Sequence, residues 1–195
     1  SNINNTNLQD LRTKWLQTYK AWQHVEMFNI GKAEEIYFTS KMNTYPTDIT
    51  RIEANIASSS YDLINQANNF DAQGFPALDY MLYGLNEDSL LVIDKYLSNE
   101  GNKYIAYLND LVTQITNNTE LVIEYWNNNK AEFINSNGNT ATSSVNLLTN
   151  DFIYYYEKGL RANKIGIPVG IFSGSALPQN VECYYYNLET GTASK

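Results

Sequence analysis

Histidine and cysteine are nearly absent from this sequence, which contains one of each in 195 residues. The single cysteine, Cys183, cannot form an internal disulfide or a cysteine-based zinc site, because both require more than one thiol. The single histidine, His24, excludes any metal site built from two histidines of this chain, including the H-E-x-x-H site of many metallopeptidases. These two absences remove most of the usual metallohydrolase arrangements.

Long apolar runs and an excess of basic residues are also missing. No stretch of about eighteen consecutive apolar residues occurs, so the sequence predicts no transmembrane segment. The 13 basic and 21 acidic residues give a formal charge of −8, which argues against nucleic acid as a partner because phosphate binding needs a basic patch. The sequence begins without an initiator methionine or a signal peptide, and we therefore expect a processed or trimmed domain.

The sequence does contain a series of amphipathic segments with helical spacing. Hydrophobic residues make up 43% of the chain, which is enough for a sizeable core, and 16 tyrosines suit both buried positions and wet clefts. Apolar residues recur at intervals of three and four, and no pair of alternating strands joined by a hairpin turn is evident. Helices are therefore predicted over residues 7–29, 48–56, 61–70, 74–84, 89–97, 102–127 and 145–163.

This pattern predicts an all-α fold, an up-and-down helical bundle with irregular crossovers that contain glycine and proline. We expect a single helical domain over residues 1–195. Residues 127–144 are polar and rich in asparagine, and they predict a flexible loop. Residues 164–174 contain too much glycine and proline for a helix interior and predict an ordered, extended loop. A further helix is expected to begin near Val181.

Residues 74–84 are apolar except for one charge, Asp79. Pro76 suits the first turn of a helix here, and Phe75 and Leu78 have the spacing of core residues. A carboxylate in such a segment must be paired, hydrogen-bonded, protonated or bound to a cation, since an unpaired buried charge costs several kcal/mol. The alternative is a boundary aspartate that reaches solvent.

A second carboxylate continues an apolar face. The predicted first helix carries a stripe of large apolar side chains: Leu8, Leu11, Trp15, Tyr19 and Trp22. The next position of this stripe is Glu26, whereas His24 points elsewhere on the helix and is interpreted as a surface or boundary residue. Together with Glu182, these inward carboxylates could form an oxygen-rich cation site. These carboxylates could equally well accept hydrogen bonds from tyrosine hydroxyls or from Arg51.

Four stretches in order carry a resemblance to a known family. They are Trp22-x-x-x-Glu26-x-Phe28-x-x-Gly31, residues 43–52 around Tyr45-Pro46, residues 74–84, and residues 164–182 with Lys164-Ile165-Gly166 and Val181-Glu182. They resemble the imelysin family, peptidase-like proteins of the bacterial envelope that include iron-regulated members. The resemblance implies an all-α bundle and a periplasmic or outer-surface location, as a lipoprotein whose anchor lies outside this sequence. The family is longer, so we expect the first bundle and the start of the second half.

The family's signature on residues 74–84 is Gly-x-His-x-x-Glu, and this chain departs from it twice. Pro76 stands at the position of the histidine, and Asp79 stands at the position of the glutamate. Proline offers no ligand atom and no proton, and aspartate is shorter by one methylene. The sequence therefore does not predict a zinc-peptidase site of this type.

The leading hypothesis is a noncatalytic envelope binding protein linked to the acquisition of iron, another metal or a ligand. Its partner would be a small ligand, a metal ion such as iron, calcium or zinc, or a peptide, with Glu26 and Asp79 as the metal ligands. The residues expected to line the cleft are Trp22, Glu26, Arg51, Phe75, Pro76, Asp79, Tyr80 and Glu182. The alternatives are a metallopeptidase of the imelysin type and a structural interaction module in which these acids are satisfied within the core.

Overall fold

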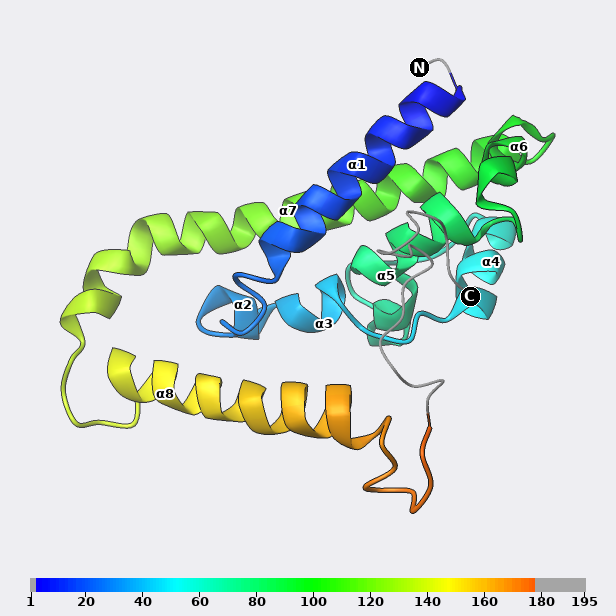
Figure 1. The fold of residues 1–195 in the computed structure, drawn as a ribbon. Helices are drawn as coiled ribbons and strands as arrows, with labels where there is room; N and C mark the ends of the chain where they lie inside the picture. Colours follow the sequence, from blue (N-terminus) through cyan, green and yellow to red (C-terminus); the bar gives the residue numbers. More distant parts are fainter. Residues whose placement is uncertain (1–2, 178–195) are drawn as a thin grey trace. The chain divides into compact units, whose positions relative to one another are not determined.

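The computed structural model describes residues 3–177, and all regular secondary structure in this range is helical (Figure 1). Eight α-helices are present there: α1 (Asn5–Trp22), α2 (Lys32–Glu35), α3 (Phe38–Met42), α4 (Ile49–Ser58), α5 (Gly74–Asp79), α6 (Val92–Leu97), α7 (Gly101–Asn135) and α8 (Ser144–Tyr154). Short 3-10 helices, η1 (Ala67–Ala72) and η3 (Ser89–Leu91), and π-helices, η2 (Tyr80–Gly84) and η4 (Tyr155–Gly166), complete the list. The all-α prediction is confirmed. Among these helices, none has the length and hydropathy of a membrane span.

The residue contacts group into two compact units. Among the described residues, the first unit comprises 3–22 and 40–117, and the second comprises 23–39 and 118–177. Helix α7 contributes residues to both units. That residues 1–195 form a single domain stays a prediction.

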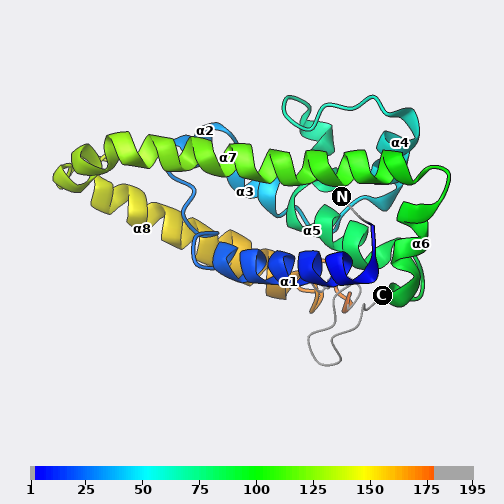
Figure 2. The ribbon, with the colours of Figure 1, turned by 90° about the horizontal axis from the view of Figure 1, so that it is seen from above.

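The core of the first unit surrounds α5 and η2. Figure 2 shows α5 between α1 and the first part of α7. On α1 the apolar stripe points inward as expected, with Leu8, Trp15 and Trp22 all buried. From the other side, Tyr104, Tyr107 and Leu111 of α7 are buried. The core therefore takes apolar faces from helices that are far apart in the sequence.

Helix α4 begins where its sequence predicts. Asp48 is the N-cap, and its side chain accepts a hydrogen bond of 3.0 Å from the backbone N–H of Arg51. This bond satisfies one of the amide groups that a helix start leaves without an intrahelical partner. Ile52 and Ile56 then point into the core one turn apart.

The second unit contains α2, the second part of α7, α8, η4 and the turns that follow. Residues 136–143 form the loop that returns the chain from α7 to α8 (Figure 1). The backbone N–H and the hydroxyl of Ser144 both donate to the carbonyl oxygen of Ser136, each at 2.7 Å, and so close this loop.

The prediction of a loop from residue 127 is wrong, because α7 continues to Asn135. Aromatic contacts support the added helical turns: Trp126 and Phe133, seven residues apart, lie edge-to-face at 5.0 Å. Asn129 also donates its side-chain N–H to the carbonyl of Tyr125, at 2.8 Å, so its amide bonds within the helix. Contacts between side chains of the same helix thus offset the weak helix propensity of asparagine.

The first helix is shorter than predicted. It ends at Trp22, and residues 23–27 form turns instead of continuing to residue 29. Glu26 is buried, but it is held by a different set of contacts from those of the α1 stripe. Contacts with α8 and η4, described below, replace the helical hydrogen bonds of this stretch.

Two other segments differ in helix type. In residues 61–70 the Asp62 carboxylate accepts the backbone N–H groups of Ile64 and Asn65, so a turn precedes the short η1. This competition from an aspartate side chain is a known cause of lost helix. The helix predicted over 145–163 is present, but its second part, η4, has π hydrogen bonding. Residues 167–174 form hydrogen-bonded turns, and the helix expected near Val181 lies outside the described residues.

We predict that Gly74→Ala destabilises the first unit by about 2–4 kcal/mol. Gly74 has φ +75°, and a Cβ atom there would overlap the backbone carbonyl oxygen of Met42. The matched control is Gly138→Ala, because a Cβ at Gly138 meets no atom within 4 Å and its φ is not positive. Urea denaturation monitored by circular dichroism measures both variants. Equal stabilities for the two variants would contradict this explanation.

Candidate functional site

The 74–84 segment, which carries most of the predicted site residues, is the buried centre of the first unit. Every side chain from Phe75 to Tyr83 is buried, including those of Pro76 and Asp79. Gly74 allows close approach to the chain at Met42, and Pro76 occupies the first turn of α5, where its missing N–H is harmless. The segment is thus buried all round, as expected of a helix that is apolar on nearly every face.

Side chains from other helices bind the backbone carbonyls of this segment. The indole of Trp15 donates to the carbonyl of Phe75 at 3.2 Å, and the hydroxyl of Tyr96 donates to that of Met81 at 2.7 Å. Arg12 donates through Nε and Nη2 to the carbonyl of Leu82, at 2.9 and 2.6 Å, and through Nη2 to that of Ser89, at 2.8 Å. The carbonyls of Met81 and Leu82 lie near the end of η2, where the last carbonyls of a helix have no partner within it. Tyr96 and Arg12 therefore supply donors to buried backbone groups that need them.

Arg12 is 5% exposed, and its partners are carbonyls and an aromatic ring. Its guanidinium carbon lies 4.5 Å from the centroid of the Tyr83 ring, within the range of a cation–π contact. Burial lowers the pKa of Arg12, while the nearby Tyr83 and Tyr96 act in the opposite direction. A guanidinium still remains charged at neutral pH. The cation therefore acts as a clamp on the 74–84 segment.

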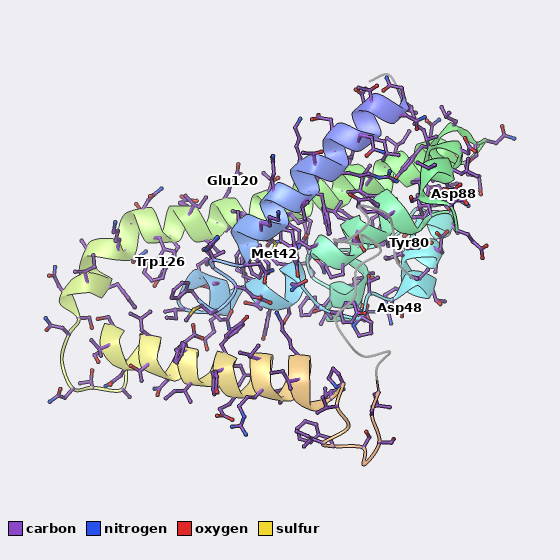
Figure 3. All side chains as sticks on the ribbon, viewed as in Figure 1. Met42, Asp48, Tyr80, Asp88, Glu120 and Trp126 are labelled. Atoms are coloured by element: carbon purple, nitrogen blue, oxygen red, sulfur yellow. The ribbon has the colours of Figure 1, made fainter. Side chains whose placement is uncertain are left out.

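The hydroxyl of Tyr80 links this segment to a half-buried carboxylate, Glu53 of α4. Tyr80, labelled in Figure 3, donates to Glu53 Oε1 at 2.6 Å, and Tyr104 donates to Glu53 Oε2 at 2.6 Å. Lys95 Nζ lies 4.7 Å from the centroid of the Tyr104 ring. Burial, together with the hydrogen bond and the charge of Glu53, raises the pKa of Tyr104, which is therefore a neutral donor at pH 7. Both oxygens of Glu53 are occupied by short, charge-assisted bonds.

The remaining predicted residues of the first unit have structural partners. Trp22 is 4% exposed and packs against Phe75, with ring centroids 6.0 Å apart. Asp79 is 1% exposed and takes part in polar interactions. Arg51 Nε lies 3.1 Å from Asp71 Oδ1, but the N–H is not directed at that oxygen, so the contact is an ion pair rather than a hydrogen bond. A longer contact of 3.5 Å joins Arg51 to Asp48.

Glu26 belongs to the second unit, where it faces a cation. Lys164 Nζ lies 3.4 and 3.2 Å from Oε1 and Oε2 of Glu26, and the Tyr155 hydroxyl donates to Oε2 at 3.1 Å. Glu26 is 6% exposed, whereas the Lys164 side chain is 28% exposed. The same stretch is fixed again at Asn29, whose backbone N–H donates to Asp151 of α8 at 2.8 Å. Two acidic side chains thus hold residues 26–29 against α8 and η4.

Glu26 and Asp79 fall in different units, so their proximity stays a prediction. Glu182 lies outside the described residues. Within residues 3–177 no three histidine, cysteine, aspartate or glutamate side chains converge as a metal site would require. Pro76, which the sequence resemblance sets at the position of the family's histidine, has no donor atom and is buried. This donor set does not fit the zinc of a His-x-x-Glu peptidase.

The sequence analysis missed several residues on which this arrangement depends: Arg12, Glu53, Tyr104, Tyr155 and Lys164. Arg12 had a visible signal, since it lies between Leu8 and Trp15 on the stripe of α1 and is a cation on an apolar face. Glu53 and Lys164 had no comparable signal. Each lies on a partly polar surface, and its partner comes from a distant part of the chain.

A family model described as Imelysin matches residues 1–187. No curated protein and no solved structure gives a significant match to the chain. The match spans both units and includes the 74–84 segment.

Arg12→Met should destabilise the protein by about 2–4 kcal/mol, because it leaves the carbonyls of Leu82 and Ser89 buried without donors. Arg12→Lys should retain part of this stability, since one ammonium group can reach one carbonyl. Arg161→Met is the control: Arg161 pairs with Glu157 on an exposed helix surface, and its removal should leave the midpoint unchanged. The midpoints of urea denaturation of these three variants measure the differences in stability. A midpoint of Arg12→Met as high as that of Arg161→Met would disprove the clamp.

Asp151→Asn should raise stability at pH 7. Burial raises the pKa of Asp151, with a contribution from Glu34, while the Asn29 N–H opposes the shift. A folded-state pKa above the unfolded value gives stability that is present below the unfolded pKa and lost as the pH rises through the folded pKa. Asparagine is neutral at every pH and avoids this loss. The stability advantage of Asp151→Asn over wild type should therefore shrink as the pH falls toward about 3.8, because Asp151 is then protonated in wild type as well. Thermal unfolding across this pH range measures the difference between variant and wild type. The control is Asp10→Asn, on the exposed face of α1. If Asp151→Asn were less stable than wild type at pH 7, a raised pKa of Asp151 would be refuted.

Proposed function

Because the chain belongs to the imelysin family, we propose that it is a noncatalytic binding protein of the bacterial cell envelope that serves the acquisition of iron or of another ligand. The observation that carries the proposal is Pro76. It stands at the position of the family's signature histidine, it offers no atom to a metal or a proton, and its side chain is buried. A binding role needs neither a metal-activated water nor a general base at this position.

The carboxylates of the two units differ in how firmly they are held, and this supports a ligand role for Glu26. Glu53 accepts two hydroxyls at 2.6 Å, whereas the contacts of Glu26 with Tyr155 and Lys164 are 3.1–3.4 Å long. Longer contacts are weaker, and Lys164 is partly solvent-exposed. We infer that a cation or a cationic ligand group can replace Lys164 at Glu26. The lysine would then swing into solvent.

The ligand class follows from this exchange. Carboxylate oxygens bind hard cations such as calcium and ferric iron, and they also bind ammonium or guanidinium groups of a peptide. Asp79 remains a proposed second ligand through the signature it partly preserves. The envelope location, as a periplasmic or surface lipoprotein, is part of the proposal and rests on the family.

A structural interaction module is the second candidate. It is favoured by the burial of Phe75, Pro76 and Asp79, because these side chains fill the core of the first unit. In that case the acids of both units would serve folding alone. The two candidates differ in whether neutralising Glu26 affects anything besides stability.

A thermal-shift series with ferric, calcium and zinc ions tests the proposal. A ligand at about 100 times its Kd stabilises the folded state by about 2.7 kcal/mol, which corresponds to roughly 5–10 °C for a chain of this size. We expect Glu26→Gln to abolish the shift and Lys164→Met to increase it, because the competing ammonium is gone. Glu53→Gln is the matched control, which should lower the midpoint but keep the ligand-induced shift.

Two outcomes would decide against binding at Glu26. If Glu26→Gln stabilises the chain and no ion shifts the midpoint of wild type, the structural module is correct. If the purified chain cleaves peptides and a chelator stops this turnover, the noncatalytic assignment is wrong.

A further inference from the structure

The turns that follow η4 expose an unusual number of large apolar side chains. Residues 165–172, here named the apolar loop, contain only isoleucine, glycine, proline, valine and phenylalanine, so no side chain in the loop can form a hydrogen bond. Ile165 and Val169 are 49% and 58% exposed, and Ile171 and Phe172 are each 69% exposed. Contiguous apolar exposure of this kind marks an interaction surface.

The apolar loop is ordered by its own backbone. The N–H of Val169 donates to Ile165 at 3.1 Å, that of Ile171 donates to Gly166 at 2.9 Å, and that of Leu177 donates to Pro168 at 2.8 Å. Gly170 has φ +83°, and a Cβ there would overlap the carbonyl of Ser175. These contacts order the backbone of the loop, on which four large apolar side chains are exposed while Pro168 is buried.

The segment that leads into the apolar loop is less acidic than the chain as a whole. Residues 157–177 contain three basic residues and one acidic residue, Glu157, whereas the whole chain carries −8. Lys164 is paired with Glu26, and Arg161 pairs with Glu157 through two exposed side chains. Lys158 is exposed and makes no ion pair within the described part of the chain. Lys158 is thus able to contact an anionic surface, and Arg161 can do so by exchanging its exposed pair with Glu157, which is worth little free energy.

We propose that the apolar loop inserts into the interfacial region of an anionic lipid bilayer, with Lys158 and Arg161 next to the lipid phosphates. Apolar side chains flanked by cations are the composition of interfacial membrane anchors. A protein partner would need hydrogen bonds, at about one per 100–200 Å² of interface, and the side chains of residues 165–172 supply none. The acyl region of a bilayer requires no hydrogen bonds from inserted side chains, provided that the inserted backbone N–H and C=O groups are bonded within the protein. This inference goes beyond ligand binding at Glu26 and does not depend on it.

Co-sedimentation of the full chain with vesicles tests the proposal. We expect binding to phosphatidylglycerol vesicles, much weaker binding to phosphatidylcholine vesicles, and a loss of affinity as salt increases. The double variant Ile171→Ser with Phe172→Ser should reduce the partition coefficient more than tenfold. Leu90→Ser is the matched control, since Leu90 is 68% exposed in the first unit and should not affect binding.

Lys158→Glu should weaken binding to anionic vesicles several-fold without changing the far-ultraviolet circular dichroism spectrum.

The proposal is overturned if wild type does not bind phosphatidylglycerol vesicles, or if the double serine variant binds as well as wild type. It is also overturned if gel filtration shows a wild-type dimer that the serine variant dissociates, because a second copy would then cover the loop. Thermal unfolding of the serine variant checks that the fold is intact, and a large drop in its midpoint would show that the loop is covered within the chain instead.

Discussion

The first unit depends on how one helical segment is buried on every side. Burial of residues 74–84 removes their side chains from water, but it also removes backbone carbonyls of α5 and of the end of η2. Arg12, Trp15 and Tyr96 supply donors to these carbonyls. Because each donor also belongs to a packed helix, the same contacts that satisfy the backbone fix α1 and α6 against the segment. In this unit the hydrogen bonding of the buried backbone and the packing of the helices therefore depend on the same side chains.

The need to satisfy buried polar groups is met differently at two carboxylates, Glu53 and Glu26. Glu53 is surrounded by tyrosine hydroxyls at short distance, and losing either hydroxyl would leave a half-buried oxygen without a donor. Glu26 instead faces a lysine that reaches it from a partly exposed position. An ion pair of this kind has little net free energy, since the attraction is offset by desolvation of both groups. The proposed exchange would keep a cation beside Glu26 and so would avoid the cost of leaving a buried charge without a partner.

Much of the fold could be predicted because its signals are local. Three- and four-residue spacing gave most of the helices, and Asp48 gave the start of α4. The apolar context of Asp79 left a buried and a solvent-reaching carboxylate open, and the structure has the buried one. The errors have two different sources. Residues 26–29 are bound by Asp151 and Lys164, which lie far away in the sequence, so the local pattern after Trp22 does not contain these partners. In α7 the signal was local, because Trp126 and Phe133 lie in contact on the same helix, but the asparagine-rich composition of residues 127–135 was given more weight.

The candidate site was less predictable than the fold for a related physical reason. Motif resemblance directed attention to residues 74–84, where the family signature lies, but burial has turned this segment into core. The features on which the two proposals rest, a cation-paired glutamate and the apolar loop, both lie in the second unit and both involve η4 or the turns after it. We therefore infer that the first unit is a scaffold, and that ligand exchange and surface contact belong to the second.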